Sequence, residues 1–410
     1  MASPAPGRMS LADGHRFLAV PLAAGFRRCR RAARGGSGGA CTIAPGHYND
    51  TDWPRMMPRP PVVPRQNQGV AMSARVVCFG ELLLRLAAPG REKLLQSPRL
   101  EVCVGGAEAN VGVSLARFGH AVSVVSTVAD NPLGEAVVGE LRRHGLDTSA
   151  VRRVPGRMGL YFLAPGAIHR PAEVLYDRAG SAFALAAADA YDWNALLAGA
   201  DWLHLSGVTP ALGANTAAAA LAAARAARAA GAKVSFDGNF RPKLWEAWQG
   251  DAAAILRELM AEADVLFADH RDMGVVLGGQ YPQSGPLERV QAAAADAFAA
   301  FPRLQWMACT LRTPRNVDHH ALAGVLVGRQ SGTALAPQEE VGPIVDRIGG
   351  GDAFAAGVLH GLVRGWEPER TIRFGLAAGC LKHSIPGDFN LVSETDVEAL
   401  VGEGRYDVRR

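Results

Sequence analysis

A run of three glycines followed by an aspartate is the stretch of this sequence that most clearly predicts chemistry. Gly349, Gly350 and Gly351 come directly before Asp352, and apolar residues continue at helical spacing as far as Val363. Consecutive glycines let the backbone turn so that its N–H groups converge, and the first turn of a helix adds the positive end of its dipole. The stretch predicts an anion hole for a transferring phosphoryl group, with Asp352 as the base that accepts a proton from an attacking hydroxyl. The plain alternative is that Asp352 is a helix cap.

Two further motifs precede this stretch. Residues 105–110 read Gly-Gly-Ala-Glu-Ala-Asn, and residues 237–242 read Asp-Gly-Asn-Phe-Arg-Pro. Together with residues 346–357, they resemble the signatures of the PfkB, or ribokinase-like, carbohydrate kinase family, and the resemblance covers most of the chain after residue 75. It implies an α/β fold, a three-layer α/β/α sandwich with a mostly parallel sheet and a small β-sheet lid. It also implies ATP as co-substrate with Mg²⁺, leaves room for a monovalent cation, and places Gly106 and Asn110 at the sugar.

Within that family, four stretches resemble the 2-keto-3-deoxygluconate kinases. They are residues 176–182, 206–212, 239–245 and 382–388. This resemblance implies a site for a sugar acid, phosphorylated on its C6 hydroxyl, and lined by Gly106, Asn110, Tyr161, Tyr176, Arg178, Val208 and Arg241. Arginine suits a planar carboxylate because its guanidinium donates two parallel hydrogen bonds, and a tyrosine ring suits a polyol. For each arginine, the alternative is an ordinary solvated surface charge.

The expected metal-binding stretch departs from the family pattern. Where many members carry an Asn-x-x-Glu element after a strand, this chain has Asp269 and Asp272. The two aspartates keep the spacing and the oxygen chemistry that Mg²⁺ prefers, so we expect them to organise the metal, in part through water. A pair of surface carboxylates is the alternative.

The expected nucleotide loop departs more strongly. The family usually has Thr-x-Gly-x-x-Gly here, whereas residues 310–317 contain neither glycine. We expect Thr310, Gly349 and Gly351 to contact the nucleotide. Arg312 or Arg315 could supply a side-chain charge in place of the missing backbone contacts; alternatively the loop lies further away and holds ATP more weakly. There is no Walker-type Gly-Lys-Ser/Thr loop, which argues against the P-loop fold but not against a kinase.

The elements that must position these residues alternate between strands and helices. Apolar runs predict buried strands, and segments of helical periodicity lie between them. Strands are predicted at 76–79, 122–125, 202–205, 234–236, 265–267 and 306–310, and helices at 106–118, 134–144, 215–230 and 352–363. Such alternation predicts a mostly parallel sheet with helices on both faces and ligands at the carboxyl ends of its strands. Residues 82–104 and 160–178 break the rhythm and predict the strands of a lid, with ordinary surface hairpins as the alternative.

The first 72 residues differ from the rest in composition. They hold ten Arg, no Lys and three Asp, with Gly-rich and Pro-rich runs, whereas the remainder carries 33 basic and 36 acidic residues. Such a segment buries too little apolar surface to fold, so we expect 1–72 to be a disordered extension and 73–402 to be the kinase domain. A start codon assigned too early, a targeting arm and a basic tail are competing origins. The near-neutral body does not indicate nucleic-acid binding, but the basic arm keeps a nucleic-acid or membrane-associated role open.

Six dispersed cysteines without a Cys-x-x-Cys pair predict free thiols in a reducing compartment. No stretch reaches the roughly 20 apolar residues that a bilayer span needs, so we expect a cytoplasmic enzyme without a membrane partner. Lid strands expose edges that pair between subunits, which predicts a homo-oligomer formed through the lid. Two other functions stay open, namely a kinase of a neutral sugar such as fructose or ribose, and a non-catalytic sugar-acid sensor.

Overall fold

The protein is seen here as a computed structural model that describes residues 73–402, which belong to one compact unit. The predicted disordered extension, residues 1–72, lies outside the described residues. Everything that follows concerns the described part of the chain.

A nine-stranded sheet forms the centre of the fold, in the order β13-β12-β11-β10-β9-β8-β1-β4-β5. The strands from β5 to β11 run parallel to one another, and β12 and β13 are antiparallel additions at one edge. This arrangement confirms the predicted mostly parallel sheet. The strands are β1 (Arg75–Phe79), β4 (Ala121–Ala129), β5 (Val151–Val154), β8 (Trp202–Ser206), β9 (Lys233–Asp237), β10 (Val265–Phe267), β11 (Trp306–Pro314), β12 (His320–Gly328) and β13 (Gly332–Val341).

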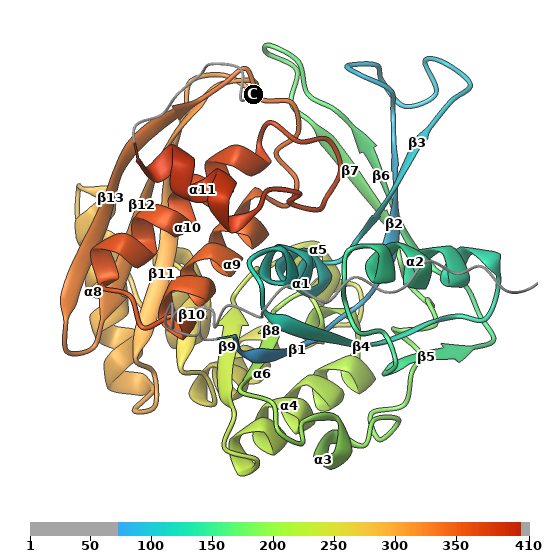
Figure 1. Cartoon of the computed structure of the whole chain (residues 1–410), viewed down its shortest axis with the longest axis horizontal. Coiled ribbons are helices and arrows are strands. Elements are labelled where there is room, and N and C mark those ends of the chain that lie inside the picture. The colour runs from blue at the N-terminus through green and yellow to red at the C-terminus, as the bar shows by residue number, and fades with distance from the viewer. Residues whose placement is uncertain (1–72, 403–410) are drawn as a thin grey trace, which may run out of the picture. The chain divides into compact units, whose positions relative to one another are not determined.

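Helices cover both faces of this sheet, as Figure 1 shows for the α1, α9 and α10 side and for the α4 side. One core lies under α1, α2, α9, α10 and α11, and a second lies under α3, α4, α6, α7 and α8. The helices are α1 (Ala107–Arg117), α2 (Pro132–Arg143), α3 (Trp193–Leu196), α4 (Ala214–Ala229), α5 (Pro242–Glu246), α6 (Ala252–Ala261), α7 (His270–Leu277), α8 (Pro286–Ala300), α9 (Gly350–Val363), α10 (Pro368–Lys382) and α11 (Glu394–Val401), with a 3₁₀ turn at Pro210–Leu212.

Strand β1 shows why the sheet lies between two helical layers. Its side chains alternate in direction, so Val76 and Cys78 enter the first core while Val77 and Phe79 enter the second. A strand buried on both faces reads as a continuous apolar run, which is why the sequence revealed it.

The predicted lid is a separate four-stranded sheet, in the order β3-β2-β6-β7. Its strands are β2 (Leu83–Ala87), β3 (Glu101–Gly105), β6 (Gly159–Ala164) and β7 (Glu173–Asp177). The central pair, β2 and β6, is parallel, and each outer strand pairs antiparallel with its neighbour. The two segments that break the strand–helix rhythm therefore form one sheet, which in Figure 1 projects away from the main sheet.

Strand β11 is longer than the sequence predicted. It continues past Thr310 to Pro314, because its residues pair antiparallel with β12, from Trp306 opposite Gly328 to Pro314 opposite His320. The stretch expected to be a nucleotide-binding loop thus begins as strand. The sequence analysis did not predict β12 and β13, the partners that extend it.

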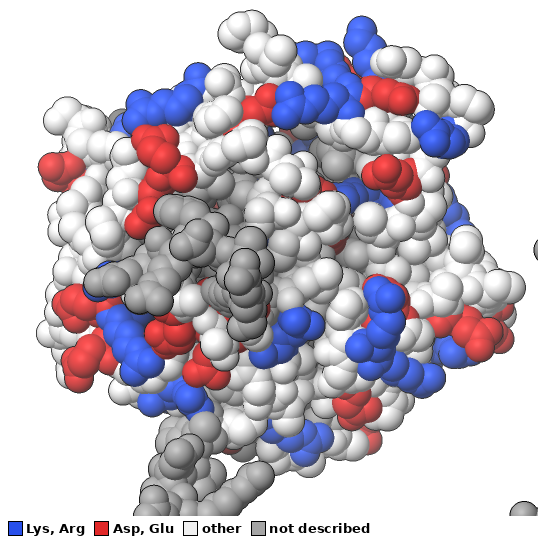
Figure 2. All heavy atoms as spheres, turned by 45° about the horizontal axis from the view of Figure 1, so that its top comes forward, with Lys and Arg blue, Asp and Glu red and all other residues white. Residues whose placement is uncertain are grey.

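The described surface carries charges of both signs. Figure 2 shows Lys and Arg interspersed with Asp and Glu on the face it presents, with no field of a single sign. Within residues 73–402, no helix is long and apolar enough to cross a membrane. The four cysteines of this region, Cys78, Cys103, Cys309 and Cys380, are free thiols.

Two buried histidines connect the start of the described chain with α9 and α11. The backbone N–H of Ala74 donates to His120 Nδ1 at 3.1 Å, and His120 Nε2 lies 2.9 Å from His360 Nδ1. Because Nδ1 of His120 is an acceptor, its proton sits on Nε2 and is donated to His360, whose own Nε2 lies 3.4 Å from Glu394. Burial lowers the pKa of His120 to about 4, with the Arg364 charge adding to the effect, and burial lowers the pKa of His360 to about 3.

We expect the His120–His360 pair to lower the stability of the folded protein as the pH falls from about 7 to about 5, in opposition to carboxyls of raised pKa such as Glu108, which act in the other direction. The unfolded chain protonates both imidazoles near their ordinary pKa of about 6.5, whereas the folded chain keeps them neutral, so stability is lost below that pKa. Each imidazole should contribute roughly 2 kcal/mol over this range, so the pair contributes roughly 4 kcal/mol. Thermal unfolding at both pH values measures it, with His360→Phe for comparison. An equally large pH-dependent drop in the variant would contradict this account.

Candidate active site

The carboxyl ends of the parallel strands meet at one edge of the main sheet, and predicted site residues gather there. Strand β8 leads into Val208, β9 ends at Asp237 shortly before Arg241, and β10 is followed by Asp269. The N-terminus of α9 reaches the same place, because Gly351 lines one cavity with Asp237, Arg241 and Asp269. In open α/β sheets this edge is where ligands bind.

Two of the three glycines occupy positions that a residue with a side chain could not take without displacement. Gly349 is the N-cap of α9 with a φ of +81°, and a Cβ there would lie 2.0 Å from the carbonyl oxygen of Asp388. A Cβ on Gly350 would lie 2.7 Å from the ring of His383, whereas one on Gly351 would meet no atom within 4 Å. Gly349 and Gly350 are therefore packed against the protein, and Gly351 faces open space at the start of the helix.

Asp352 lies in the first turn of α9, behind this opening. It is not the helix cap, because Gly349 occupies that position, so the capping alternative is wrong. Its Oδ2 accepts a hydrogen bond from Asn110 Nδ2 at 2.7 Å. Burial raises the pKa of Asp352 to about 6, and the Asp388 carboxylate adds to this, while the bond from Asn110 and the Arg241 charge lower it. A carboxyl with such a pKa is ionised near neutral pH and still accepts a proton readily.

Helix α1 brings Asn110 to Asp352. At its N-cap, a Cβ on Gly106 would lie 2.4 Å from a backbone oxygen, so only glycine fits. In the first turn, Oε1 of the buried Glu108 accepts hydrogen bonds from the backbone N–H of Ser206 (3.0 Å), the Ser206 hydroxyl (2.7 Å) and the hydroxyl of Thr209 (2.7 Å). Burial raises the pKa of Glu108 to about 7. Glu108 thus fixes α1 to the end of β8, next to Val208.

The predicted metal aspartates also cap a helix. Asp269 is the N-cap of α7, and its carboxylate accepts from the backbone N–H of Arg271 at 2.7 Å and pairs with that guanidinium. In return, Asp272 Oδ2 accepts from the Asp269 backbone N–H at 2.9 Å. Both carboxylates therefore have a structural role, in addition to any role at a metal.

A groove of about 460 Å³ brings Asp272 together with Asp237. Burial raises the pKa of Asp237 well above its usual value, and the carboxylates of Asp352 and Asp272 raise it further. Burial also raises the pKa of Asp272 to about 6. Among residues 73–402, no three His, Cys, Asp or Glu side chains converge to enclose a metal ion. The crowded negative charge fits Mg²⁺, which keeps waters and binds through one or two carboxylates and substrate phosphates.

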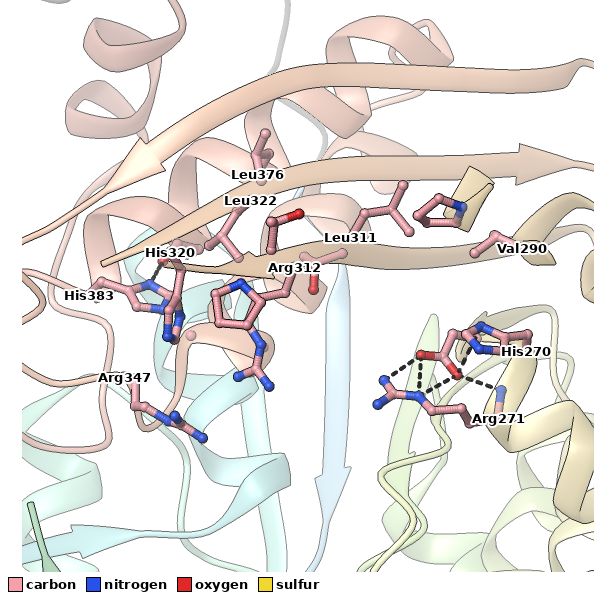
Figure 3. Close-up of a pocket in the computed structure, with 18 of the residues that line it drawn as sticks. His270, Arg271, Val290, Leu311, Arg312, His320, Leu322, Arg347, Leu376 and His383 are labelled. Atoms are coloured by element: carbon pink, nitrogen blue, oxygen red, sulfur yellow. Dashed lines mark hydrogen bonds and ion pairs between the residues drawn. The ribbon is translucent and has the colours of Figure 1, made fainter. Parts of the chain in front are cut away.

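A second cavity, of about 600 Å³, adjoins this groove and shares Gly351, Thr310, Asp269 and Arg271 with it. Figure 3 shows its apolar side chains, Leu311, Leu322, Leu376 and Val290, on one side and its basic side chains on the other. Thr310 and Gly351, two of the predicted nucleotide contacts, line both this cavity and the groove. Because Gly351 lies at the start of α9, the cavity reaches that end of the helix.

The lid side of the site contains a buried polar network. The hydroxyl of Tyr161 donates to Asp388 Oδ2 at 2.7 Å, so this predicted sugar ligand already has a partner. Arg85 bridges two carboxylates, with Nη2 at 2.7 Å from Asp346 and Nη1 at 3.1 Å from Asp388. Tyr176 is more exposed, with its ring centroid 6.3 Å from that of Tyr161.

The two predicted carboxylate-binding arginines have different surroundings. Arg178 is buried, and its Nε donates to Glu81 Oε2 at 2.6 Å while Nη2 lies 2.5 Å from the same oxygen. It is not a solvated surface charge, and its Nη1 has no hydrogen-bond partner among residues 73–402. Arg241 is exposed at the aspartate groove, where its Nη1 donates to the carbonyl of Phe240 at 3.1 Å.

Sequence reasoning missed the polar residues that support the site, chiefly Glu81, Arg85, Glu108 and Asp388. Arg85 lies between leucines in a lid strand, and a charge inside an apolar run is a signal of a buried partner. The partners themselves lie far away in the chain, so the sequence did not reveal which residues they were.

A half-buried carboxyl of raised pKa in the first turn of α9, beside a groove and a larger cavity, suits a phosphotransferase with an alcohol group as acceptor. Residues 73–393 match the family described as pfkB family carbohydrate kinase, and the chain belongs to that family. The predicted family and fold are thereby confirmed.

Several relatives are similar over nearly their whole length. The 2-dehydro-3-deoxygalactonokinase of Haloferax volcanii is 32% identical over 339 residues, which cover 83% of this chain and 100% of that protein. The 2-dehydro-3-deoxygluconokinase of Bacillus subtilis is 28% identical over 78% of this chain and 92% of that protein. The solved structure of 2-dehydro-3-deoxygluconokinase from Thermotoga maritima superposes with a TM-score of 0.76 at 35% identity, covering 80% and 99% of the two chains.

Replacing Asp352 by Asn should lower kcat by roughly 10²–10⁴-fold, the usual effect of losing a general base. In the unaltered enzyme, turnover should fall as the pH drops through about 6, because protonation of this carboxyl removes the base. Steady-state kinetics across pH measures both effects, and circular dichroism checks that the variant is folded. Normal turnover by a folded Asp352→Asn variant would rule out the assignment.

Proposed function

We propose that the protein is a cytoplasmic, ATP-dependent sugar-acid kinase that transfers the γ-phosphoryl group of ATP to the C6 hydroxyl of 2-keto-3-deoxygluconate. The observation that carries the proposal is the half-buried Asp352, which accepts a hydrogen bond from Asn110 and directly follows Gly351, whose Cβ position is open. The names of the relatives from Haloferax volcanii, Bacillus subtilis and Thermotoga maritima support a 2-keto-3-deoxy sugar acid as the acceptor.

In this mechanism, Asp352 takes the proton of the C6 hydroxyl while that oxygen bonds to the γ-phosphorus and the bond to ADP breaks. The backbone N–H groups of Gly349 and Gly351 and the dipole of α9 would stabilise the charge on the transferring group. The backbone N–H of the predicted third donor, Gly350, donates to the carbonyl of Arg347 at 3.3 Å. Asp237 and Asp272 would hold Mg²⁺, mostly through water, with Asp269 fixing the position of Asp272. The metal supplies positive charge to the β- and γ-phosphates.

The sugar acid would lie between the lid and the head of α1. In this proposal, Gly106, Asn110 and Val208 contact the sugar from the main sheet, and Tyr176 covers it from the lid. Glu81 holds the guanidinium of Arg178 by Nε and Nη2, which leaves Nη1 for the carboxylate of the substrate. In this proposal Tyr161 does not contact the sugar acid directly; its hydroxyl holds Asp388 in place. Arg241 lies nearer the phosphoryl group, since its charge reaches Asp237, Asp272 and Asp352.

A coupled kinase assay with Mg·ATP across sugar acids, fructose and ribose should give the highest kcat/KM for 2-keto-3-deoxygluconate. Arg178→Lys keeps a charge but loses the fork of donors, so it should raise KM for the acid roughly tenfold and leave KM for ATP unchanged. Glu81→Gln is the matched comparison, because it releases the guanidinium and should give a smaller change in the same direction.

Three results of this assay decide between the alternatives. A higher kcat/KM for fructose or ribose would identify a neutral-sugar kinase. Binding of the acid without transfer would identify a sensor. Repeating the assay with K⁺ in place of Na⁺ tests the predicted monovalent cation.

We also propose that the lid mediates homo-oligomer formation. Large apolar side chains of the lid strands are exposed, among them Val102 (59%), Val174 (40%) and Leu175 (61%). Two of them lie on β7, which is an edge strand of the lid sheet. Val102 and Leu175 lie on the same face of the lid sheet, in register with Leu86 and Phe162, whereas Val174 lies on the other face. An exposed apolar face next to an unpaired strand edge favours contact with a second copy.

Leu175→Lys should shift the protein toward the monomer in sedimentation velocity, because it places a charge in the contact. Leu335→Lys is the matched control, since Leu335 is an exposed leucine on β13 of the main sheet and should have no effect. An unchanged sedimentation profile for Leu175→Lys, or a shift caused equally by Leu335→Lys, would exclude the lid as the interface.

A further inference from the structure

The larger cavity has more positive charge than the protein itself neutralises. Four arginines and one aspartate line it, namely Arg271, Arg289, Arg312, Arg347 and Asp269. Only Arg271 is paired, through its guanidinium contacts with Asp269. The other three arginines have no ion-pair partner within residues 73–402, so they leave an excess of positive charge in the cavity.

Two of these arginines approach each other and a pair of histidines. The positive charges of Arg347 and Arg271 lower the pKa of Arg312 further, beyond the effect of burial. Burial lowers the pKa of His320, and then Arg312, Arg347 and His383 lower it further. Figure 3 shows Arg312, Arg347, His320 and His383 on the same side of the cavity. Cations that depress one another's pKa values in this way indicate a place where an anion is expected.

His320 provides an independent sign of a ligand. It is 3% exposed, it lines the cavity, and its Nδ1 has no hydrogen-bond partner in the part of the chain that the structure describes. The Nε of Arg289, which also lines the cavity, is likewise buried and without a partner there. Buried polar atoms without partners are rare in folded proteins, so a polar molecule is expected to contact them.

The strand geometry decides between the two arginines of the stretch that lacks glycines. Arg312 is part of β11, opposite Leu322 of β12, and its side chain lines the cavity. Arg315 lies beyond the strand, is not part of the cavity wall, and pairs with Glu340 at 3.0 Å. Only Arg312 is therefore placed to act on a molecule in the cavity.

We propose that Arg312 and Arg347 bind the phosphate chain of the nucleotide donor through their guanidinium groups, in place of the backbone amides of a glycine loop. This inference rests on the proposed function and names the residues that recognise its donor. Arg347 lies two positions before Gly349, and Gly351 joins this cavity to the aspartate groove, so a phosphate chain held here ends at Asp352. The base of the nucleotide would lie against the apolar wall of Leu311, Leu322 and Leu376.

Recognition by guanidinium groups has a measurable consequence. Two arginines bind phosphate oxygens through paired, charged donors, so much of the donor affinity should come from the phosphates. Added salt screens such interactions. Inorganic tripolyphosphate, which has the phosphate chain without a nucleoside, should therefore compete with ATP for the site.

The test compares Arg312→Gln and Arg347→Gln with Arg315→Gln as the matched control, because Arg315 is an arginine of the same segment whose charge is used elsewhere. Isothermal titration calorimetry gives the Kd for ATP and for tripolyphosphate without sugar acid, and steady-state kinetics gives KM and kcat. Each of the first two variants should weaken ATP roughly 10- to 100-fold and leave KM for the sugar acid unchanged, since hydrogen bonds to charged groups have about that strength. The control should stay within about twofold.

Arg312→Lys is a second variant that keeps the charge if the Gln variant does not fold, and it should weaken ATP by an intermediate factor. An unchanged Kd for ATP in folded Arg312 and Arg347 variants would overturn the inference, as would an equal effect of Arg315→Gln or an absence of tripolyphosphate competition.

Because these are binding measurements, they separate this inference from the proposed function. Loss of ATP binding in the variants of a protein that phosphorylates none of the sugar acids would support this inference and reject the proposed function. Phosphorylation of the sugar acid together with normal ATP binding in the variants would support the proposed function and reject this inference.

Discussion

The guanidinium of Arg85 holds together the parts of the chain that make the site. Its side chain is 4% exposed and contacts Asp346 at 2.7 Å and Asp388 at 3.1 Å. Asp346 begins the segment that leads to the glycines, and the backbone of Asp388 lies against Gly349. Tyr161, from the neighbouring lid strand, donates to the same Asp388. One charge therefore fixes the lid to the anion-binding loop, and removing one partner of such a buried pair typically costs about 3–5 kcal/mol.

The rest of the site is organised by separation of charge. Asp237 and Asp272 line the groove together with Gly351, and the carboxylates of Asp272 and Asp352 raise the pKa of Asp237. Arg312 and Arg347 lie in the cavity on the other side. Each group alone is unfavourable, because like charges raise the free energy of the empty site. In a nucleotide complexed with a divalent cation, the cation complements the aspartates and the phosphates complement the arginines. A single ligand therefore offsets the repulsion within both groups.

The sequence was informative where the chemistry depends on neighbouring residues and much less so where it depends on distant ones. Glycines before Asp352 and the alternation of strands and helices predicted the fold family, the head of α9 and the lid. Arg178 shows the limit, because only the folded chain reveals that Glu81 holds its guanidinium. The same holds for Thr310, which looked like the start of a loop because β12, the strand that pairs with it, is defined only by the sheet. The capping of α7 by Asp269 and Asp272 could not be predicted from the sequence either, because acidic residues at this spacing are typical both of a helix N-terminus and of a metal site.

The parallel pairing of β2 with β6 has a consequence for how the protein folds. These two central lid strands are separated in the chain by α1, β4, α2 and β5, which belong to the main sandwich. The pairs β2–β3 and β6–β7 can each form locally. Joining β2 to β6 closes a long loop, and the entropy lost on closing it opposes this step. The intervening sandwich segment shortens that distance once it has folded. We therefore read the lid as a late-folding unit, assembled on a sandwich that already carries the base.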